Sequence, residues 1–203
     1  MEFLSSETAK NLARSFAGES QARTRYSIYA EIARTEKQEY LARIFDETAG
    51  NELAHAKEFL ETIQRLGKRP AANIEFDAGY PFELGTTEEN LAFAAEGERQ
   101  EHEKIYPAFA AAAREEGFPE AAQLWEQVAR IEGEHLAVYE DALRQLKDGT
   151  LYRKEQPKVW RCLNCGFLIE AEEPWAVCPV CHRDGGWVQA WVDRRPAPKD
   201  IQI

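Results

Sequence analysis

Glu52-Leu53-Ala54-His55 and Glu132-Gly133-Glu134-His135 are two copies of one pattern, a glutamate followed three residues later by a histidine. Both copies lie in segments rich in Ala, Glu, Leu, Arg and Gln, residues that favour α-helix. Residues three apart share one face of a helix, and here that face also carries the apolar stripe that would be buried. One such motif is a weak signal, but an unpaired charge in a core is costly, so its repetition indicates metal ligands directed into a helical core.

A further glutamate interrupts the apolar stripe of the segment before each motif. Glu19 precedes Glu52 by 33 residues, and Glu98 precedes Glu132 by 34, so residues 1–150 hold a weak internal repeat. One Glu from each of two helices and a Glu-x-x-His motif from each of two others form the ligand pattern of di-iron four-helix bundles. The alternative is a set of surface glutamates with helix-stabilising Glu–His pairs, and the matched spacing of two motifs favours the metal site.

Glu101 lies one helical turn after Glu98, at the position that Ala22 occupies in the first half of the repeat. This fifth carboxylate gives seven potential ligands, so the two metal sites should not be equivalent; a solvated glutamate is the alternative. Tyr26 and Tyr139 each follow a proposed ligand by seven residues. They are expected either to hydrogen-bond to the ligands or to be ordinary core tyrosines.

Four helices are expected over residues 6–34, 37–66, 86–117 and 119–148. Their connections are short, long and short, which is typical of a ferritin-like four-helix bundle with one crossover, here residues 68–85. The expected helix ends are marked by Gly67 and Gly117 as C-terminal glycines, by a capping box of Thr86 with Glu89, and by Pro119 in a first turn.

Interruptions within these helices fall beside the proposed ligands. Gly18, Gly97 and Gly133 would allow helices to approach closely, and Pro107 should disturb the third helix just after residue 106. His102 is expected on the surface or in a turn.

The composition excludes several classes of protein. Apolar residues make up 44% of the chain, enough for a buried core, and the formal net charge of −11 argues against a nucleic-acid-binding surface. The sequence contains no run of about 18 apolar residues, so we expect no membrane span. The first residues lack the pattern of a secretory signal, so we expect a cytoplasmic protein with no membrane partner.

All four cysteines lie in two Cys-x-x-Cys pairs, Cys162 with Cys165 and Cys178 with Cys181. Such pairs form a strong signal for a metal held by four thiolates, and disulfides are the alternative. The spacing leaves zinc and iron open, because both accept tetrahedral sulfur. Short strands are expected over residues 159–160, 167–169 and 187–192, in a small domain of residues 157–195 that the metal would stabilise. Residues 194–203 are expected to be a loosely held end.

The union of these motifs resembles the rubrerythrin family. The segments that carry the resemblance span nearly the whole chain: residues 16–23, 52–57, 97–101, 106–107, 114–117, 132–135, 160–166 and 178–181. The resemblance implies a mainly α fold, with a ferritin-like di-iron bundle over residues 1–150 and a rubredoxin-like β domain after it. It also implies an oxidoreductase that reduces hydrogen peroxide to water and protects against oxidative stress.

The resemblance further implies roles for individual residues. The di-iron ligands are Glu19, Glu52, His55, Glu98, Glu101, Glu132 and His135, and the ligands of a single iron are Cys162, Cys165, Cys178 and Cys181. Glu101 and His55 match the ligands that the family exchanges between oxidised and reduced states, and Tyr26 and Tyr106 match its tyrosines near the iron. The cysteine site would relay electrons from an external reductase, within a head-to-tail homodimer.

The sequence departs from the family in two places. His182 follows the last cysteine, where Gly or Ala is common, so the loop over residues 183–186 is expected to rearrange. The crossover also matches poorly, which leaves helix swapping open. Two rival functions remain: a ferritin-like protein that oxidises iron for storage, and a helical interaction module with a structural zinc.

Overall fold

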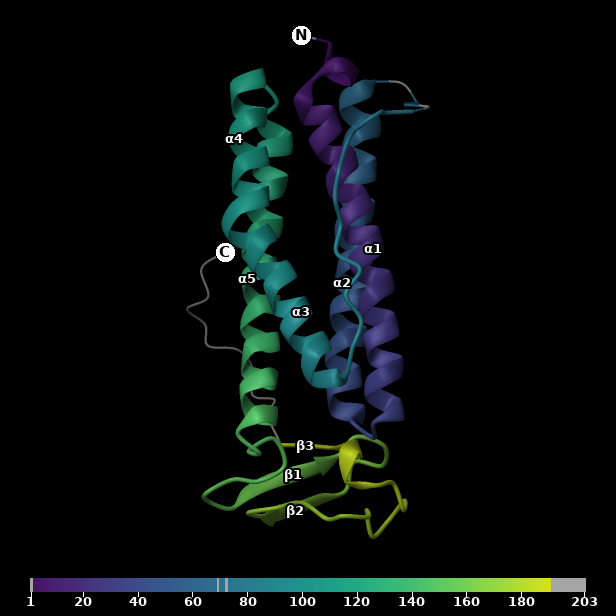
Figure 1. The fold of residues 1–203 in the computed structure, drawn as a ribbon, viewed down its shortest axis with the longest axis vertical. Helices are drawn as coiled ribbons and strands as arrows, with labels where there is room; N and C mark the ends of the chain where they lie inside the picture. Colours follow the sequence, from purple (N-terminus) through teal and green to yellow (C-terminus); the bar gives the residue numbers. More distant parts are fainter. Residues whose placement is uncertain (1, 69, 72, 191–203) are drawn as a thin grey trace.

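In the computed structural model, which describes residues 2–68, 70–71 and 73–190, long helices form a bundle and a small sheet follows it (Figure 1). After a short 3₁₀ turn at Phe3–Ser5, the helices are α1 (Glu7–Thr35), α2 (Glu39–Gly67), α3 (Thr87–Gln100), α4 (Tyr106–Glu116) and α5 (Pro119–Lys147). A π-helix (Glu101–Ile105) joins α3 to α4. The expected mainly α, ferritin-like fold is thus confirmed. Among the described residues, no helix combines the length and apolar character that a membrane crossing requires.

The third expected helix is present but interrupted. The π-helix occupies the five residues before Tyr106, and Pro107 lies in the first turn of α4, where its missing N–H is tolerated. The disturbance expected after residue 106 therefore lies before it. A π-helix accommodates an extra residue in a helical turn, and such insertions often occur at functional sites.

Most helix ends follow the local sequence signals. The Ser6 hydroxyl accepts from the Ala9 N–H at 3.1 Å, and Thr86 and Glu89 form the expected capping box. Gly117 takes the left-handed conformation at φ 84°. Gly67 was expected to do the same after α2, but it is the last helical residue, and Lys68 adopts φ 54° instead.

The hydrophobic core is divided into two clusters along the bundle. One cluster packs Tyr26, Tyr29, Phe45 and Tyr139 against α3. The other is built around Phe59, Tyr106 and Trp125, and it includes Phe3 and Leu12 near the N-terminus. Glu19 on α1 and the two Glu-x-x-His motifs on α2 and α5 lie between these clusters in sequence, so an acidic layer separates two apolar ones.

The crossover between α2 and α3 runs along the outside of the bundle beside α1 (Figure 1). The Tyr80 hydroxyl donates to the Arg14 carbonyl at 2.8 Å, and the Tyr29 hydroxyl donates to the Glu83 carbonyl at 2.7 Å. These bonds attach an otherwise irregular segment to α1.

The C-terminal sheet is antiparallel, with the strand order β2-β1-β3. Its strands are β1 (Lys158–Cys162), β2 (Leu168–Ala171) and β3 (Val188–Ala190). Phe167 and Trp187, which were expected in strands, lie outside them, and Trp187 ends a 3₁₀ turn. The predicted strand residues 191–192 and the predicted loose end 194–203 lie outside the described residues.

This sheet domain packs on the α1–α2 end of its own bundle. The Arg43 guanidinium lies 5.6 Å from the centre of the Trp187 ring, and the Tyr152 hydroxyl donates to Gln38 Oε1 at 2.9 Å. Gly186 lies so close to the Lys37 carbonyl that a Cβ atom there would clash with it.

Candidate metal centres

Six of the seven predicted carboxylate and histidine ligands converge in the middle of the bundle. Their ligand atoms form two groups, each with all atoms within 4.8 Å of one another. The first group is Glu19, Glu52, His55 and Glu132, and the second is Glu52, Glu98, Glu132 and His135. Glu52 and Glu132 belong to both groups. Two neighbouring positions that share two carboxylates are what a carboxylate-bridged metal pair requires.

The two histidines have nearly equivalent surroundings. His55 Nδ1 lies 2.9 Å from Glu52 Oε2 and 3.0 Å from Glu132 Oε1. His135 Nδ1 lies 2.8 Å from Glu132 Oε2 and 3.3 Å from Glu52 Oε1. The imidazole rings stack with their centroids 5.9 Å apart. The near-equivalence follows from the internal repeat, which supplies each position with one motif.

Several buried atoms in these groups have no hydrogen-bond partner among the described residues. They are Glu19 Oε2, Glu52 Oε1, Glu98 Oε2, His135 Nδ1 and both carboxylate oxygens of Glu132. Unpaired polar atoms are rare in a core because each one costs free energy. These atoms all face the two groups, and a mixture of carboxylate oxygen and imidazole nitrogen suits iron. The donor set therefore fits two iron ions.

Burial and mutual repulsion disturb the titration of this cluster. Burial raises the pKa of Glu98 to about 8. Burial also raises the pKa of Glu52, but the adjacent imidazoles of His135 and His55 outweigh burial and lower this pKa to about 2. The close carboxylates of Glu132, Glu52 and Glu98 likewise raise the pKa of His135 to about 12 against the effect of burial. Protons on the imidazoles thus supply positive charge that iron ions would otherwise supply.

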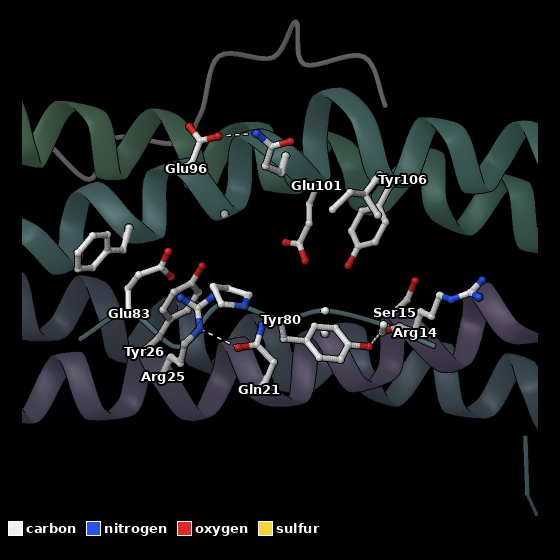
Figure 2. A pocket seen from close by; sticks show the side chains of 18 of the residues that line it. Arg14, Ser15, Gln21, Arg25, Tyr26, Tyr80, Glu83, Glu96, Glu101 and Tyr106 are labelled. Carbon is white, nitrogen blue, oxygen red and sulfur yellow. Dashed lines mark hydrogen bonds between the residues drawn. The ribbon is translucent and has the colours of Figure 1, made fainter. Parts of the chain in front are cut away.

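Glu101, the seventh predicted ligand, belongs to neither group. It is the first residue of the π-helix and is half-buried, and its carboxylate points into a cavity between α1 and α3 (Figure 2). Burial and the nearby negative charge of Glu19 raise its pKa well above the usual range. Its role as a ligand therefore stays a prediction. To bind a metal in either group, the Glu101 side chain would have to move.

Two tyrosines bind the outer carboxylates in a crossed arrangement. The Tyr26 hydroxyl on α1 donates to Glu98 Oε1 on α3 at 2.6 Å. The Tyr106 hydroxyl on α4 donates to Glu19 Oε1 on α1. Tyr106 follows Glu98 by eight residues, whereas Tyr26 follows Glu19 by seven. The π-helix takes up the extra residue, which explains why the repeat alone did not reveal Tyr106.

Of two other polar residues near the groups, Tyr139 takes one of its two expected roles and His102 differs from expectation. Tyr139 is buried, but its hydroxyl has no hydrogen bond among the described residues, so it belongs to the aromatic core. His102 was expected on the surface, yet it is half-buried and its Nδ1 lies 2.6 Å from the Ala129 carbonyl. A Cβ atom on Gly133 would lie 2.9 Å from His102 Cε1, so Gly133 allows this ring to pack on α5.

Asn51 is a polar contact of the cluster that sequence reasoning missed. Its Nδ2 lies 3.1 Å from His135 Nε2, the ring nitrogen opposite the one that faces the carboxylates. As placed, the Asn51 amide nitrogen donates to Nε2. When Nδ1 binds a metal, Nε2 carries the proton, and a 180° turn of the amide brings its oxygen into position to accept that proton. The available signal was position, since Asn51 directly precedes Glu52; Ile131 occupies the equivalent position before Glu132.

The four cysteines form a separate group in the C-terminal domain. All four Sγ atoms lie within 4.8 Å of one another, and none is in a disulfide. Cys162 and Cys181 are 3.6 Å apart, and Cys165 and Cys178 are 3.7 Å apart. A tetrahedral ion with metal–sulfur bonds of about 2.3 Å has sulfur–sulfur edges of about 3.8 Å, so the group fits a tetrathiolate metal.

The two cysteine knuckles have matching backbones. The Gly166 N–H donates to the Cys162 carbonyl at 2.9 Å, and the His182 N–H donates to the Cys178 carbonyl at 3.0 Å. Gly166 has φ 79° and His182 has φ 60°. The second knuckle therefore keeps the geometry of the first, because His182 itself adopts the left-handed conformation; the rearrangement expected over residues 183–186 stays a prediction.

A helical bundle with two carboxylate-sharing metal positions, followed by a tetrathiolate domain, defines a non-haem iron protein of the ferritin-like class. The family model described as "Rubrerythrin" matches residues 10–143. A second model, described as the rubredoxin-like domain of rubrerythrin, matches residues 160–185. The chain belongs to the rubrerythrin family. This family carries a di-iron site and a rubredoxin-like iron site, and the chain has a group of ligands for each, as expected for an iron-dependent oxidoreductase.

Similar proteins agree with this assignment over most of the chain. Rubrerythrin from Clostridium perfringens is 43% identical over 176 residues, which cover 86% of this chain and 89% of that protein. Rubrerythrin from Porphyromonas gingivalis is 40% identical, covering 87% and 86%. A solved structure of nigerythrin in a mixed-valence state superposes with a TM-score of 0.61 at 27% identity, covering 91% of this chain and 86% of that one.

Proposed function

We propose that the protein is a peroxidase that reduces hydrogen peroxide to water at the di-iron position. The reaction breaks the O–O bond, takes up two electrons and two protons, and releases two water molecules. The observation that carries this proposal is the sharing of Glu52 and Glu132 by two ligand groups, on a chain that also holds a tetrathiolate group. Two ferrous ions bound in the bundle would supply the two electrons of one turnover.

The chain's own residues would hold and adjust the metal pair. We assign the di-iron ligands to Glu19, Glu52, His55, Glu98, Glu101, Glu132 and His135, and the single iron to Cys162, Cys165, Cys178 and Cys181. Tyr26 and Tyr106 orient the outer carboxylates by the bonds described above. Glu101 lies beside the first group and His55 lies within it, so an exchange between these two ligands needs only local movement.

Electron relay supports a dimer. Glu19 is 16 residues from the end of α1 at Thr35, which places the metal groups about 24 Å along the helix from the end that carries the C-terminal domain. Electron transfer slows steeply with distance. We therefore infer that the tetrathiolate centre of one subunit serves the di-iron centre of a partner subunit in a homodimer. An external reductase would reduce the tetrathiolate iron.

The two proposed units are residues 1–150 for the di-iron bundle and residues 157–195 for the tetrathiolate domain. We place the protein in the cytoplasm, because free cysteines persist in a reducing compartment. Four reduced cysteines can bind one metal ion together, whereas four cysteines paired in disulfides cannot.

An anaerobic spectroscopic titration tests the proposal. The purified protein is reduced with dithionite, mixed with hydrogen peroxide, and then supplied with a chemical reductant while peroxide consumption is followed. Fast oxidation and sustained turnover at about one peroxide per two electrons support the peroxidase. Uptake of many irons per chain with little turnover would indicate iron storage, and a colourless protein with one zinc would indicate a structural module.

A further inference from the structure

A cavity of about 510 Å³ adjoins the metal groups on the side of the crossover (Figure 2). It lies between α1 and the helix formed by α3, the π-helix and α4. Much of its lining is apolar or aromatic: Tyr80, Pro81, Phe93, Ile105, Tyr106 and Phe109. Hydrogen peroxide has two heavy atoms and is strongly polar, so this cavity is both too large and too apolar to be shaped for it. Its volume lies in the range of small organic ligands.

The cavity meets the reactive groups at one place. Glu101 and Tyr106 both line it, and Figure 2 shows the Glu101 carboxylate pointing into it with Tyr106 beside. The Tyr106 hydroxyl also binds Glu19, a member of the first ligand group. An O–O group held at Glu101 would therefore lie next to the metal position while its substituent filled the apolar part.

The outer wall of the cavity is preformed. The Tyr80 hydroxyl donates to the Arg14 carbonyl at 2.8 Å, and Arg14 Nε donates to the Asp77 carbonyl at 3.0 Å. Tyr80 lies across the cavity from Glu101 (Figure 2). These bonds hold the crossover over the cavity, so a ligand would not have to order this wall on binding.

The charges of the lining select against an anion. Arg14 is paired with Glu7, and the Arg25 guanidinium donates to Gln21 at 2.7 Å and lies over the Tyr26 ring. The acidic side chains on the lining are Glu83, Glu96 and Glu101. Glu96 is itself paired with Arg99, and Arg25 is balanced by Glu83, so the lining has no surplus positive charge that would hold a carboxylate-bearing ligand.

From these observations we propose that the cavity binds uncharged organic hydroperoxides, with an alkyl or aryl group against Phe93 and Phe109 and the O–O group at Glu101. This inference rests on the proposed function. The O–O bond of ROOH breaks, two electrons from the reduced di-iron centre and two protons are taken up, and one alcohol and one water form. The substrate class is thus extended beyond hydrogen peroxide.

Gly18 offers a way to fill the cavity. A Cβ atom there would lie 3.6 Å from Tyr80 Cε1 and 3.9 Å from Glu101 Oε1, so the side chain of Gly18→Leu would project between these two residues. Gly50 provides the matched control, because it is also inside a helix and a Cβ atom there meets no atom within 4 Å. Both changes replace a helical glycine with leucine.

The experiment compares kcat/KM for cumene hydroperoxide with kcat/KM for hydrogen peroxide in the iron-loaded full-length protein. We expect the unchanged protein to reduce both, and Gly18→Leu to lower the ratio of the two values at least about tenfold, the scale of a steric change in an apolar pocket. Gly50→Leu should leave the ratio unchanged. Binding of 2-phenyl-2-propanol, the product alcohol, to the iron-free protein should also weaken in Gly18→Leu, as measured by calorimetry.

The outcomes separate the two proposals. Reduction of hydrogen peroxide without reduction of cumene hydroperoxide would overturn the inference and leave the proposed function standing. An equal ratio in Gly18→Leu and the unchanged protein would also overturn it, because the organic group would then lie elsewhere. Failure to reduce either peroxide would overturn the proposed function together with the inference.

Discussion

The Tyr26 hydroxyl on α1 donates a 2.6 Å hydrogen bond to Glu98 Oε1 on α3, and both side chains are buried. Tyr106 makes the corresponding bond to Glu19 Oε1 from the other half of the bundle. In each glutamate the second oxygen, Oε2, has no hydrogen bond and faces a metal position. The tyrosines thus fix one oxygen of each outer carboxylate and leave the other for the metal.

Replacement of Tyr26 by phenylalanine should reveal the strength of this bond. Removal of the hydroxyl leaves the buried Glu98 Oε1 without its donor, which costs about 1–3 kcal/mol, so the free energy of unfolding should fall by about that amount in Tyr26→Phe. Urea unfolding followed by circular dichroism measures it. Tyr139→Phe is the control, because the Tyr139 hydroxyl is buried without a hydrogen bond among the described residues. Equal losses in the two variants would show that the Tyr26 bond adds nothing specific.

The sequence predicts the bundle and most of the site because their signals are local. The helical period, the capping box at Thr86 and the two Glu-x-x-His motifs depend on neighbours within one or two turns. The convergence of Glu52 and Glu132 follows from the repeat, which places both motifs on inward faces of antiparallel helices.

The features that were missed depend on contacts between distant segments. The π-helix at Glu101 shifts the register of one half of the repeat, and the position of Glu101 in a cavity depends on how the crossover covers α1. Asn51 reaches His135 from another helix. Lys68 takes a left-handed conformation that propensity assigns to the neighbouring Gly67.

Asn51 should strengthen iron binding at the second position. It lies 3.1 Å from His135 Nε2, and loss of such a partner of a metal-binding histidine typically lowers metal affinity 10–100-fold. We expect Asn51→Leu to show about that loss for one of the two bundle irons, measured by competition with a chelator of known affinity. Ile131→Leu, at the equivalent position of the other motif, should retain the affinity. A similar loss in both variants would point to packing rather than to the hydrogen bond.

The stability of the iron-free protein should fall as the pH rises. Burial raises the pKa of Glu98 to about 8, above the unfolded value of about 4.3, so the folded form binds the proton more tightly. The stability from this group is complete below the unfolded value and is lost as the pH rises through 8. His135, with its pKa raised to about 12, acts in the same direction above about 6.5.

Iron binding should counter this loss, because it needs deprotonated ligands and thus favours higher pH. The melting temperatures of iron-loaded and iron-free protein should therefore diverge between about pH 5.5 and pH 8, as measured by calorimetry. Glu98→Gln removes one of the titrating groups, so its iron-free form should lose less stability over this range. Parallel curves for loaded and iron-free protein would contradict the expectation.

Replacement of His182 by glycine should stabilise the tetrathiolate domain. His182 has φ 60°, and the left-handed conformation costs a residue with a Cβ atom about 1–2 kcal/mol. In the iron-loaded protein, guanidinium unfolding followed by the visible absorbance of the tetrathiolate centre should shift to higher denaturant in His182→Gly. Gly166→Ala is the reciprocal test. Gly166 has φ 79°, so a Cβ atom at this position should destabilise the tetrathiolate domain by a similar amount. A shift to lower denaturant in His182→Gly would indicate that the His182 side chain makes compensating contacts.

The sharing of Glu52 between the two ligand groups gives a prediction about metal content. Glu52 belongs to both groups, whereas Glu19 belongs to one. Glu52→Ala should therefore lose both bundle irons, and Glu19→Ala should retain about one, since the second group keeps all four of its members. In both variants the tetrathiolate iron should remain, because its cysteines form a separate group in another part of the chain.

Metal analysis and the visible spectrum of the purified variants measure the two centres independently. Iron content should fall from about three ions per chain in the unchanged protein to about two in Glu19→Ala and about one in Glu52→Ala, with equal tetrathiolate absorbance in all three. Equal iron content in the two variants would argue against bridging by Glu52. Loss of the tetrathiolate absorbance together with the bundle iron would show that the centres fold as one unit, since only a shared folding transition connects Glu52 to the distant cysteines.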